Sequence, residues 1–351
     1  MKNNLFTYAT SELSQDAFLC WLMSYAMKDV KKDKALRRCA VAFLKQFVPP
    51  IKTLEDGEIY VSNIERQHGK IDVLLTLEGG YKIIVEDKTF TSDHDEQLSR
   101  YKDLLISEGV SPELIYGVYY KTGFESDTSN AEKAGYAVFD RKRILSILNA
   151  NSSGMTSDIF LDYLDYYNTF ESETQRYKIL PVEQWDWKMI QGYYDDLKKA
   201  ADFRFGSLDG AFNYGYVANP SGGFYGMWLF PRTALYYGAV EFYPYLQMEF
   251  NNGAINICVK LSIENDVQSF KPSELKDIIA YNNTHEWKYD LEQFGYFKPF
   301  RLSSGKTMTV GTIWREPRKD ISGIELTNSL QSAVDGFEQF MLYCKEKAGE
   351  T

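Results

Sequence analysis

The stretch from Lys70 to Lys88 constrains the fold of this chain most strongly. It contains two apolar runs on either side of Gly79-Gly80, a pattern that predicts a β-hairpin. Its density of Leu, Ile and Val is typical of buried strands, yet Asp72 opens the first strand and Glu86-Asp87-Lys88 closes the second. Charged side chains at buried positions are costly unless they are paired or bound to metal. We therefore expect the polar end of this hairpin to have a specific role.

The pairing register of the hairpin decides which side chains meet. If Leu77 pairs with Tyr81 across a three-residue loop, Asp72 lies opposite Glu86. Side chains at i and i+2 share a face, so Asp72, Glu86 and Lys88 then gather at one end of one face. The other face is wholly apolar and consists of Val73, Leu75, Leu77, Tyr81, Ile83 and Val85. A two-residue turn would scatter the charges over both faces, so we predict the odd-length loop.

Two neighbouring carboxylates repel each other, and each resists ionisation without a compensating cation. Magnesium prefers oxygen ligands and typically uses one or two carboxylates together with water and substrate phosphate. A lysine beside such an ion can orient a water molecule or stabilise charge on a phosphate. Asp72, Glu86 and Lys88 therefore predict metal-assisted phosphodiester hydrolysis. The alternative, an ion pair at a strand end with no catalytic role, stays open at this point.

Asp72 is followed, after thirteen residues, by Glu86-x-Lys88, and both ends of this pattern lie on the expected hairpin. The pattern resembles the motif of the PD-(D/E)xK nuclease superfamily, although Ile71 stands where that motif has proline. The following segment resembles the Q-x-x-x-Y element of the subgroup related to RecB and phage-type exonucleases, through Gln97 and Tyr101. Residues four apart lie on one helical face, so both side chains can point at one site.

The segment 11–18 resembles the opening helix of the same subgroup, in which an acidic residue joins the metal site. Glu12 is the candidate, and its alternative role is stabilisation of the helix N-terminus. The resemblance implies that Mg²⁺ or Mn²⁺ is held by Asp72 and Glu86, with the backbone carbonyl of Asp87 and with Glu12. It implies further that Lys88 positions the attacking water, while Gln97 and Tyr101 orient the site.

The implied fold class is α/β (α+β), with a restriction-endonuclease-like core in which helices flank a mixed central sheet. Helices expected over 11–27, 33–48 and 92–107, and strands over 58–67, 70–88, 114–120 and 137–139, follow the required order. The implied substrate is nucleic acid, with DNA favoured over RNA, and cleavage is expected to leave a 5′-phosphate. Bacterial restriction, repair or phage defence would be typical roles.

The composition limits how such a protein can bind its substrate. The 351 residues carry a formal net charge of −10, which argues against broad, charge-driven coating of nucleic acid. No apolar run approaches the length of a membrane span, so no membrane partner is expected. Four cysteines are scattered without a C-x-x-C pair, which argues against a zinc site and favours a reducing, cytoplasmic location.

We expect two domains, a nuclease-like domain over 1–172 and an aromatic-rich α+β domain over 173–351, with a hinge or boundary at 171–174. Apolar residues alternate with polar ones over 241–250, which predicts one core face and one face displaying Tyr243 and Tyr245. That face could stack on bases, bind a protein partner or lie under neighbouring helices. The alternative function for the whole chain is a catalytically silent nuclease fold that acts as a binding or assembly module through a partner.

Overall fold

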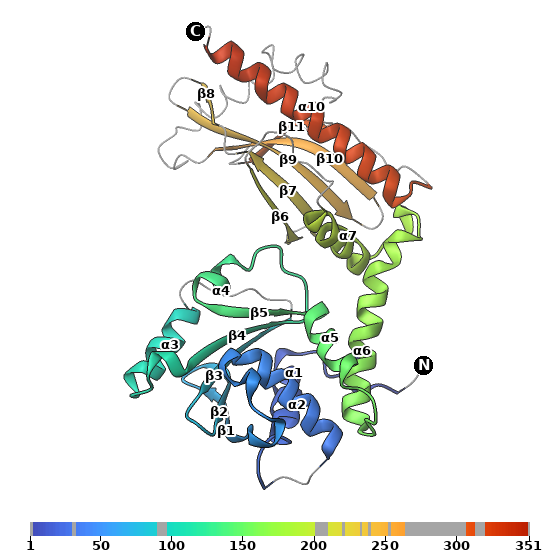
Figure 1. Cartoon of the computed structure of the whole chain (residues 1–351). Coiled ribbons are helices and arrows are strands. Elements are labelled where there is room, and N and C mark those ends of the chain that lie inside the picture. The colour runs from blue at the N-terminus through green and yellow to red at the C-terminus, as the bar shows by residue number, and fades with distance from the viewer. Residues whose placement is uncertain are drawn as a thin grey trace. The chain divides into compact units, whose positions relative to one another are not determined.

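The computed structural model describes residues 3–29, 33–89, 97–200, 210–219, 222–231, 234–237, 240–251, 254–263, 307–312 and 320–349. The chain divides into two compact units, Met1–Ser172 and Glu173–Thr351 (Figure 1). The division falls inside a helix, α6 (Asp158–Thr174), so the expected hinge or boundary segment at 171–174 is helical. None of the described helices is long and apolar enough to cross a membrane.

The remaining elements of the first unit, in chain order, are η1 (Leu5–Thr7), α1 (Glu12–Ser24), α2 (Lys34–Phe47), η2 (Pro49–Thr53), η3 (Asp56–Glu58), β1 (Val61–His68), β2 (Ile71–Leu77), β3 (Lys82–Lys88), α3 (Gln97–Ser107), η4 (Pro112–Leu114), β4 (Ile115–Lys121), α4 (Ser129–Lys133), β5 (Tyr136–Asp140) and α5 (Arg141–Ala150). The second unit contains η5 (Gln175–Lys178), η6 (Val182–Gln184), α7 (Trp187–Lys199), β6 (Gly210–Val217), β7 (Phe224–Pro231), β8 (Leu235–Tyr237), β9 (Val240–Asn251), β10 (Ala254–Ile263), β11 (Thr307–Thr312) and α10 (Gly323–Gly349).

The sheet of the first unit has the strand order β1-β2-β3-β4-β5. The first three strands pair antiparallel, whereas β3, β4 and β5 pair parallel, so the sheet is mixed. Helices α1, α2, α5 and α6 contribute to the core on one face, and α3 and α4 contribute to the core on the other. This arrangement confirms the predicted fold class, a mixed central sheet flanked by helices (Figure 1).

The predicted register of the hairpin β2–β3 is confirmed. Val73 pairs with Val85 and Leu75 with Ile83, and the Leu77 N–H donates to the Tyr81 carbonyl at 2.9 Å. The loop over 78–80 has three residues, and its two glycines adopt φ values of +97° and +87°, which favour glycine. The predicted apolar face lies against the core that α1 and α2 complete.

Local sequence signals account for most of the helix limits in the first unit. The Asp33 side chain accepts from the N–H groups of Ala35 and Leu36, which starts α2, and Pro49-Pro50 ends it. Two expectations were less accurate: α1 ends at Ser24 instead of near residue 27, and the polar stretch 123–134 contains the short helix α4. The expected cap at 92–93 of the helix α3 lies outside the described residues.

The second unit has an antiparallel sheet of order β11-β10-β9-β7-β6, with β8 also paired to β9, and with its helices it has the α+β character expected for residues 173–351. Leu246, Met248 and Phe250 are buried on one face of β9, as the alternation predicted. The expectation of displayed tyrosines is wrong for Tyr245, which is only 5% exposed. The helix expected at 273–282 and the basic cluster at 315–319 lie outside the described residues.

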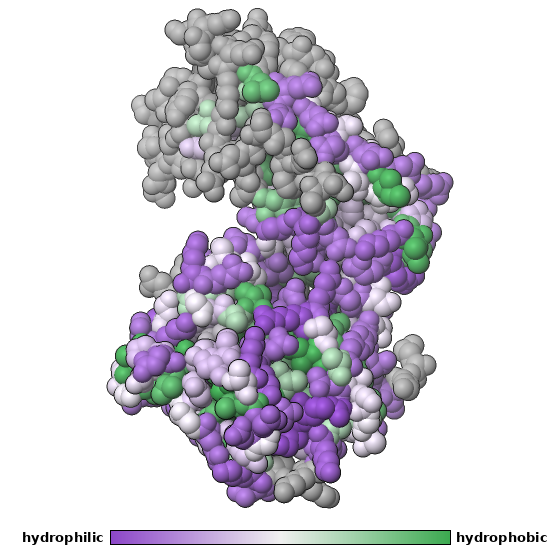
Figure 2. Space-filling view, viewed as in Figure 1, coloured by the Kyte–Doolittle hydropathy of each residue, from purple (hydrophilic) through white to green (hydrophobic). Residues whose placement is uncertain are grey.

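The polar face of β9 is organised around one carboxylate. Glu249 accepts from Gln247 at 2.6 Å and pairs with Lys260 of β10 at 2.9 Å. The face is therefore a connected polar network and not an array of open aromatic rings. In the first unit, the surface in view in Figure 2 is mostly hydrophilic, with hydrophobic residues in small separate patches.

Candidate active site

The two acids of the hairpin lie at the same end of the sheet of the first unit. The register that pairs Val73 with Val85 continues to place Asp72 opposite Glu86, on one face. The Asp87 N–H donates to Asp72 Oδ2 at 3.1 Å, and this bond ties the start of β2 to the end of β3. The side-chain amide of Gln67 approaches Asp72 Oδ1 at 3.4 Å.

Glu86 is fully buried, and its two oxygens have different surroundings. Its Oε1 accepts from Lys88 Nζ at 2.7 Å and from Gln97 Nε2 at 2.9 Å. Its Oε2 is buried without a hydrogen-bond partner. Burial, followed by the negative charge of Asp72, raises the pKa of Glu86 to about 7. Glu86 Oε1 is thus held in place by two donors, whereas Glu86 Oε2 has no hydrogen-bond partner among the described residues and is available to a bound ligand.

Helix α3 supplies the second part of the predicted motif. Gln97 Nε2 also donates to the Tyr101 hydroxyl at 2.5 Å, and that hydroxyl donates to the Lys70 carbonyl at 2.8 Å. These bonds connect α3 to β3 and to the turn between β1 and β2. The structure therefore brings together Asp72, Glu86, Lys88, Gln97 and Tyr101 on one face of the sheet.

Helix α1 approaches the same sheet end with two acids. Glu12 Oε1 accepts from the Thr89 N–H at 2.9 Å, one residue beyond β3. Asp16, one turn further on, is 1% exposed. Burial, followed by the charge of Asp72, raises its pKa to about 6, and Arg66 acts in the opposite direction. Sequence reasoning favoured Glu12 over Asp16, although their spacing of four residues already places both on one helical face.

The Asp87 side chain was not anticipated, because only its backbone carbonyl was expected at the metal. The side chain is 1% exposed and neither carboxylate oxygen has a hydrogen-bond partner. Burial raises the pKa of Asp87 well above its usual range, and the charges of Asp16, Glu12 and Asp72 add to that effect. Successive side chains on a strand alternate, so Asp87 faces α1 while Glu86 faces α3.

Residues 3–158 match the family model of the PD-(D/E)XK nuclease superfamily. This part of the chain is therefore similar to that superfamily. Among curated proteins and among solved structures, no match was found. The superfamily match covers the hairpin, α1 and α3, and it suggests a nuclease-type function for this unit without naming a substrate.

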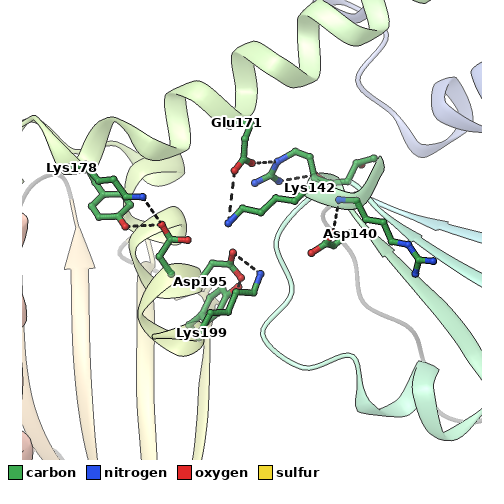
Figure 3. A network of polar contacts seen from close by, with 12 residues as sticks. Asp140, Lys142, Glu171, Lys178, Asp195 and Lys199 are labelled. Carbon is green, nitrogen blue, oxygen red and sulfur yellow. Dashed lines mark hydrogen bonds and ion pairs between the residues drawn. The ribbon is translucent and has the colours of Figure 1, made fainter. Parts of the chain in front are cut away.

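The strand end that carries Lys88 is anchored from the segment that follows β4. The Thr122 N–H donates to the Lys88 carbonyl at 3.2 Å, and Arg141 Nη1 donates to the Thr122 carbonyl at 2.7 Å. Glu171 of α6 accepts from Arg141 Nε at 2.8 Å and lies 3.9 Å from Lys142 Nζ (Figure 3). The position of the Lys88 backbone thus depends on contacts of β4, α5 and α6.

The donor set at this sheet end fits a divalent cation. Buried side-chain oxygens without a partner in the described part of the chain lie on both faces here: Glu86 Oε2 on the α3 face, and Gln15 Oε1, Asp16 Oδ1, Asp87 Oδ1 and Asp87 Oδ2 on the α1 face. Buried groups without partners require an explanation such as a bound ion. Within the described ranges, no three or more His, Cys, Asp or Glu side chains form a complete ligand set. One or two carboxylates with water and phosphate are the usual ligands of magnesium.

Proposed function

We propose that the unit Met1–Ser172 is a divalent-metal-dependent nuclease that hydrolyses phosphodiester bonds of nucleic acid. The observation that carries this proposal is the shared face of Asp72, Glu86 and Lys88, with one oxygen of Glu86 held and the other left without a partner. The match of residues 3–158 to a nuclease superfamily supports it.

Asp72 and Glu86 would hold Mg²⁺ or Mn²⁺, and Glu12 and the Asp87 carbonyl are the further candidate ligands. When bound, the ion supplies positive charge that stabilises the phosphate during attack. Lys88 orients the attacking water and stabilises charge on the scissile phosphate. Gln97 fixes Glu86 Oε1 through its 2.9 Å bond, and Tyr101 fixes Gln97. The water oxygen bonds to phosphorus, the bond to the 3′ oxygen breaks, and a 5′-phosphate remains.

Nuclease assays of the full chain test this proposal. Single- and double-stranded oligonucleotides of DNA and RNA are incubated with Mg²⁺, with Mn²⁺ or with EDTA. Cleavage should require the ion and should fall by about 10²-fold or more in Asp72→Asn and Lys88→Ala proteins. Lys28→Ala is the matched control, because Lys28 is an exposed lysine that pairs with Glu78 in the hairpin loop at the opposite end of β3. Cleavage that survives both active-site substitutions would overturn the proposal.

Two observations favour the alternative, a catalytically silent module. Lys88 and the buried Glu86 form a closed ion pair, and the chain is acidic overall. A silent module would bind a protein partner without metal and equally well after Asp72→Asn and Lys88→Ala, and it would cleave none of the substrates. We favour DNA as the substrate, a bacterial restriction, repair or defence role, and a cytoplasmic location. We assign residues 173–351 to the choice of substrate or partner.

A further inference from the structure

Asp87 lies on the face of β3 that the proposed nuclease reaction does not use. It pairs in register with Tyr120 of β4, and Tyr120 belongs to the core between the sheet and α1. Glu86 and Lys88, one residue to either side, point to the face that α3 covers. The Asp87 carboxylate is therefore separated by the sheet from the Glu86 carboxylate.

Helix α1 brings two more oxygen donors to this face. Gln15 and Asp16 are 2% and 1% exposed. The Gln15 amide donates to the Thr89 hydroxyl, and Thr89 follows Asp87 by two residues, on the same side of the backbone. Among the charged side chains, Asp16 acts most strongly on Asp87. Gln15, Asp16 and Asp87 thus form one buried group, the α1-face cluster.

The α1-face cluster contains acceptors that no protein donor satisfies. Both oxygens of Asp87, Oδ1 of Asp16 and Oε1 of Gln15 are buried without partners. Arg66 Nη2 lies 3.9 Å from Asp16 Oδ2, too far for a hydrogen bond. Two buried carboxylates and a neutral amide, with four oxygens that accept no hydrogen bond, offer the hard oxygen ligands that a divalent cation prefers.

We propose that Gln15, Asp16 and Asp87 bind a divalent cation between α1 and β3, in addition to the ion that Asp72 and Glu86 would hold on the other face. This cation joins a helix to the strand that carries Lys88. We assign it a structural role, because the Asp87 side chain lies on the face of β3 opposite to Glu86 and Lys88. The Asp72 charge acts on Asp16 as well, so the two proposed ions would lie near the same end of the sheet. The inference concerns ion binding and holds whether or not the protein cleaves nucleic acid.

The test counts bound Mn²⁺ ions in the full chain, by the electron paramagnetic resonance signal of free Mn²⁺ and by titration calorimetry. The wild type should bind two ions, and Asp87→Asn and Asp72→Asn should each bind one. The double variant should bind none. Asp56→Asn, which alters an exposed carboxylate paired with Lys45, is the matched control and should bind two.

Thermal unfolding keeps the test decisive if ion counts are reduced by misfolding. Asp87→Asn preserves shape and removes a buried charge, so in EDTA it should be at least as stable as the wild type. In Mn²⁺ it should be less stable than the wild type. Asp87→Asn that binds as many ions as the wild type would overturn the inference, and so would a wild type that binds one ion. Two bound ions without cleavage would instead overturn the nuclease proposal alone.

Discussion

Glu86 is the residue whose ionisation the fold opposes most clearly on the α3 face. Its pKa rises from the ordinary 4.5 to about 7, first because it is buried and second because Asp72 is close. Lys88 acts in the opposite direction but does not cancel these effects. A bound divalent ion would cancel these effects, because it favours the charged form of both carboxylates.

The first prediction concerns pH and the stability of metal-free protein. Below pH 4.5 Glu86 is protonated in the folded and unfolded states and has no effect on the free energy of unfolding. As the pH rises from about 4.5 to about 7, only the unfolded chain releases the proton, so stability falls, by at most about 3 kcal/mol. Above that range the loss is constant.

Thermal unfolding in EDTA between pH 4 and 8 measures this effect. Glu86→Gln should lose less stability than the wild type over that range, since it cannot ionise. Asp16 and Asp87 contribute in the same direction in both proteins, so the difference isolates Glu86. Equal pH dependence in the two proteins would contradict the prediction.

The second prediction concerns Gln97. Its amide holds Glu86 Oε1 at 2.9 Å, so Gln97→Leu releases a ligand that the proposed ion needs in a fixed orientation. Loss of such supporting hydrogen bonds typically weakens metal binding 10–100-fold. Calorimetric titration with Mn²⁺ measures the change at the Asp72–Glu86 site, and Gln184→Leu, at an exposed position, is the control. Unchanged affinity would show that Glu86 does not depend on Gln97.

Among the elements, the connection after β4 has the tightest packing near the site. A Cβ added to Gly123 would stand 1.7 Å from the Thr89 carbonyl oxygen, which belongs to the backbone that follows Lys88. Backbone atoms cannot move aside as a flexible side chain can, so Gly123→Ala must displace either the segment around Gly123 or the segment around Thr89. We predict a loss of about 1–3 kcal/mol in the free energy of unfolding, with loss of cleavage.

Denaturant unfolding checks the Gly123 prediction. Gly57→Ala is the control, because a Cβ there meets nothing within 4 Å. If Gly123→Ala is as stable and as active as Gly57→Ala, then the close approach of the two segments does not hold the strand end in place.

The parts of the site that the sequence predicted are those set by short-range rules. Alternation and loop length placed Asp72 opposite Glu86, and helical spacing placed Gln97 near Tyr101. Alternation alone also implies that Asp87 faces away from Glu86, and this implication was missed. What no local pattern supplied is the burial of Asp16, since it depends on the rotation of α1 against the sheet.

The second unit illustrates the same limit. Alternation along β9 correctly separated the apolar face from the polar one. It did not predict that Tyr245 is buried or that Glu249 gathers Gln247 and Lys260, because these contacts depend on the neighbouring strand. Periodicity assigns a side chain to a face, whereas burial depends on what packs against that face.

At the scale of the whole molecule, the two units each have a buried core of their own. Large side chains such as Phe43 and Tyr119 are fully buried in the first unit, and Leu246 and Phe340 in the second. The proposed ions bind only in the first. We therefore predict two calorimetric unfolding transitions. Mg²⁺ should raise the free energy of unfolding in only one of them, by about 3 kcal/mol for each bound ion at a hundredfold excess over its Kd.

The Asp72→Asn/Asp87→Asn double variant provides the control, because Mg²⁺ should shift neither of its transitions. A shift of both wild-type transitions by the same amount would contradict the assignment of the ions to the first unit.

The three loop residues between the paired Leu77 and Tyr81 limit how this protein can vary. Gly79 and Gly80 have no side chain and the Glu78 side chain forms an exposed ion pair with Lys28, so the identities of the three residues are open to exchange wherever the positive φ values are respected. The number of loop residues cannot change, because adding or removing one would move every side chain of β3 to the opposite face of the sheet. The positions of the acids at one end of the sheet therefore depend on the length of the loop at the other end. Inserting or deleting one residue in that loop should abolish the proposed nuclease activity, although every acidic residue would still be present.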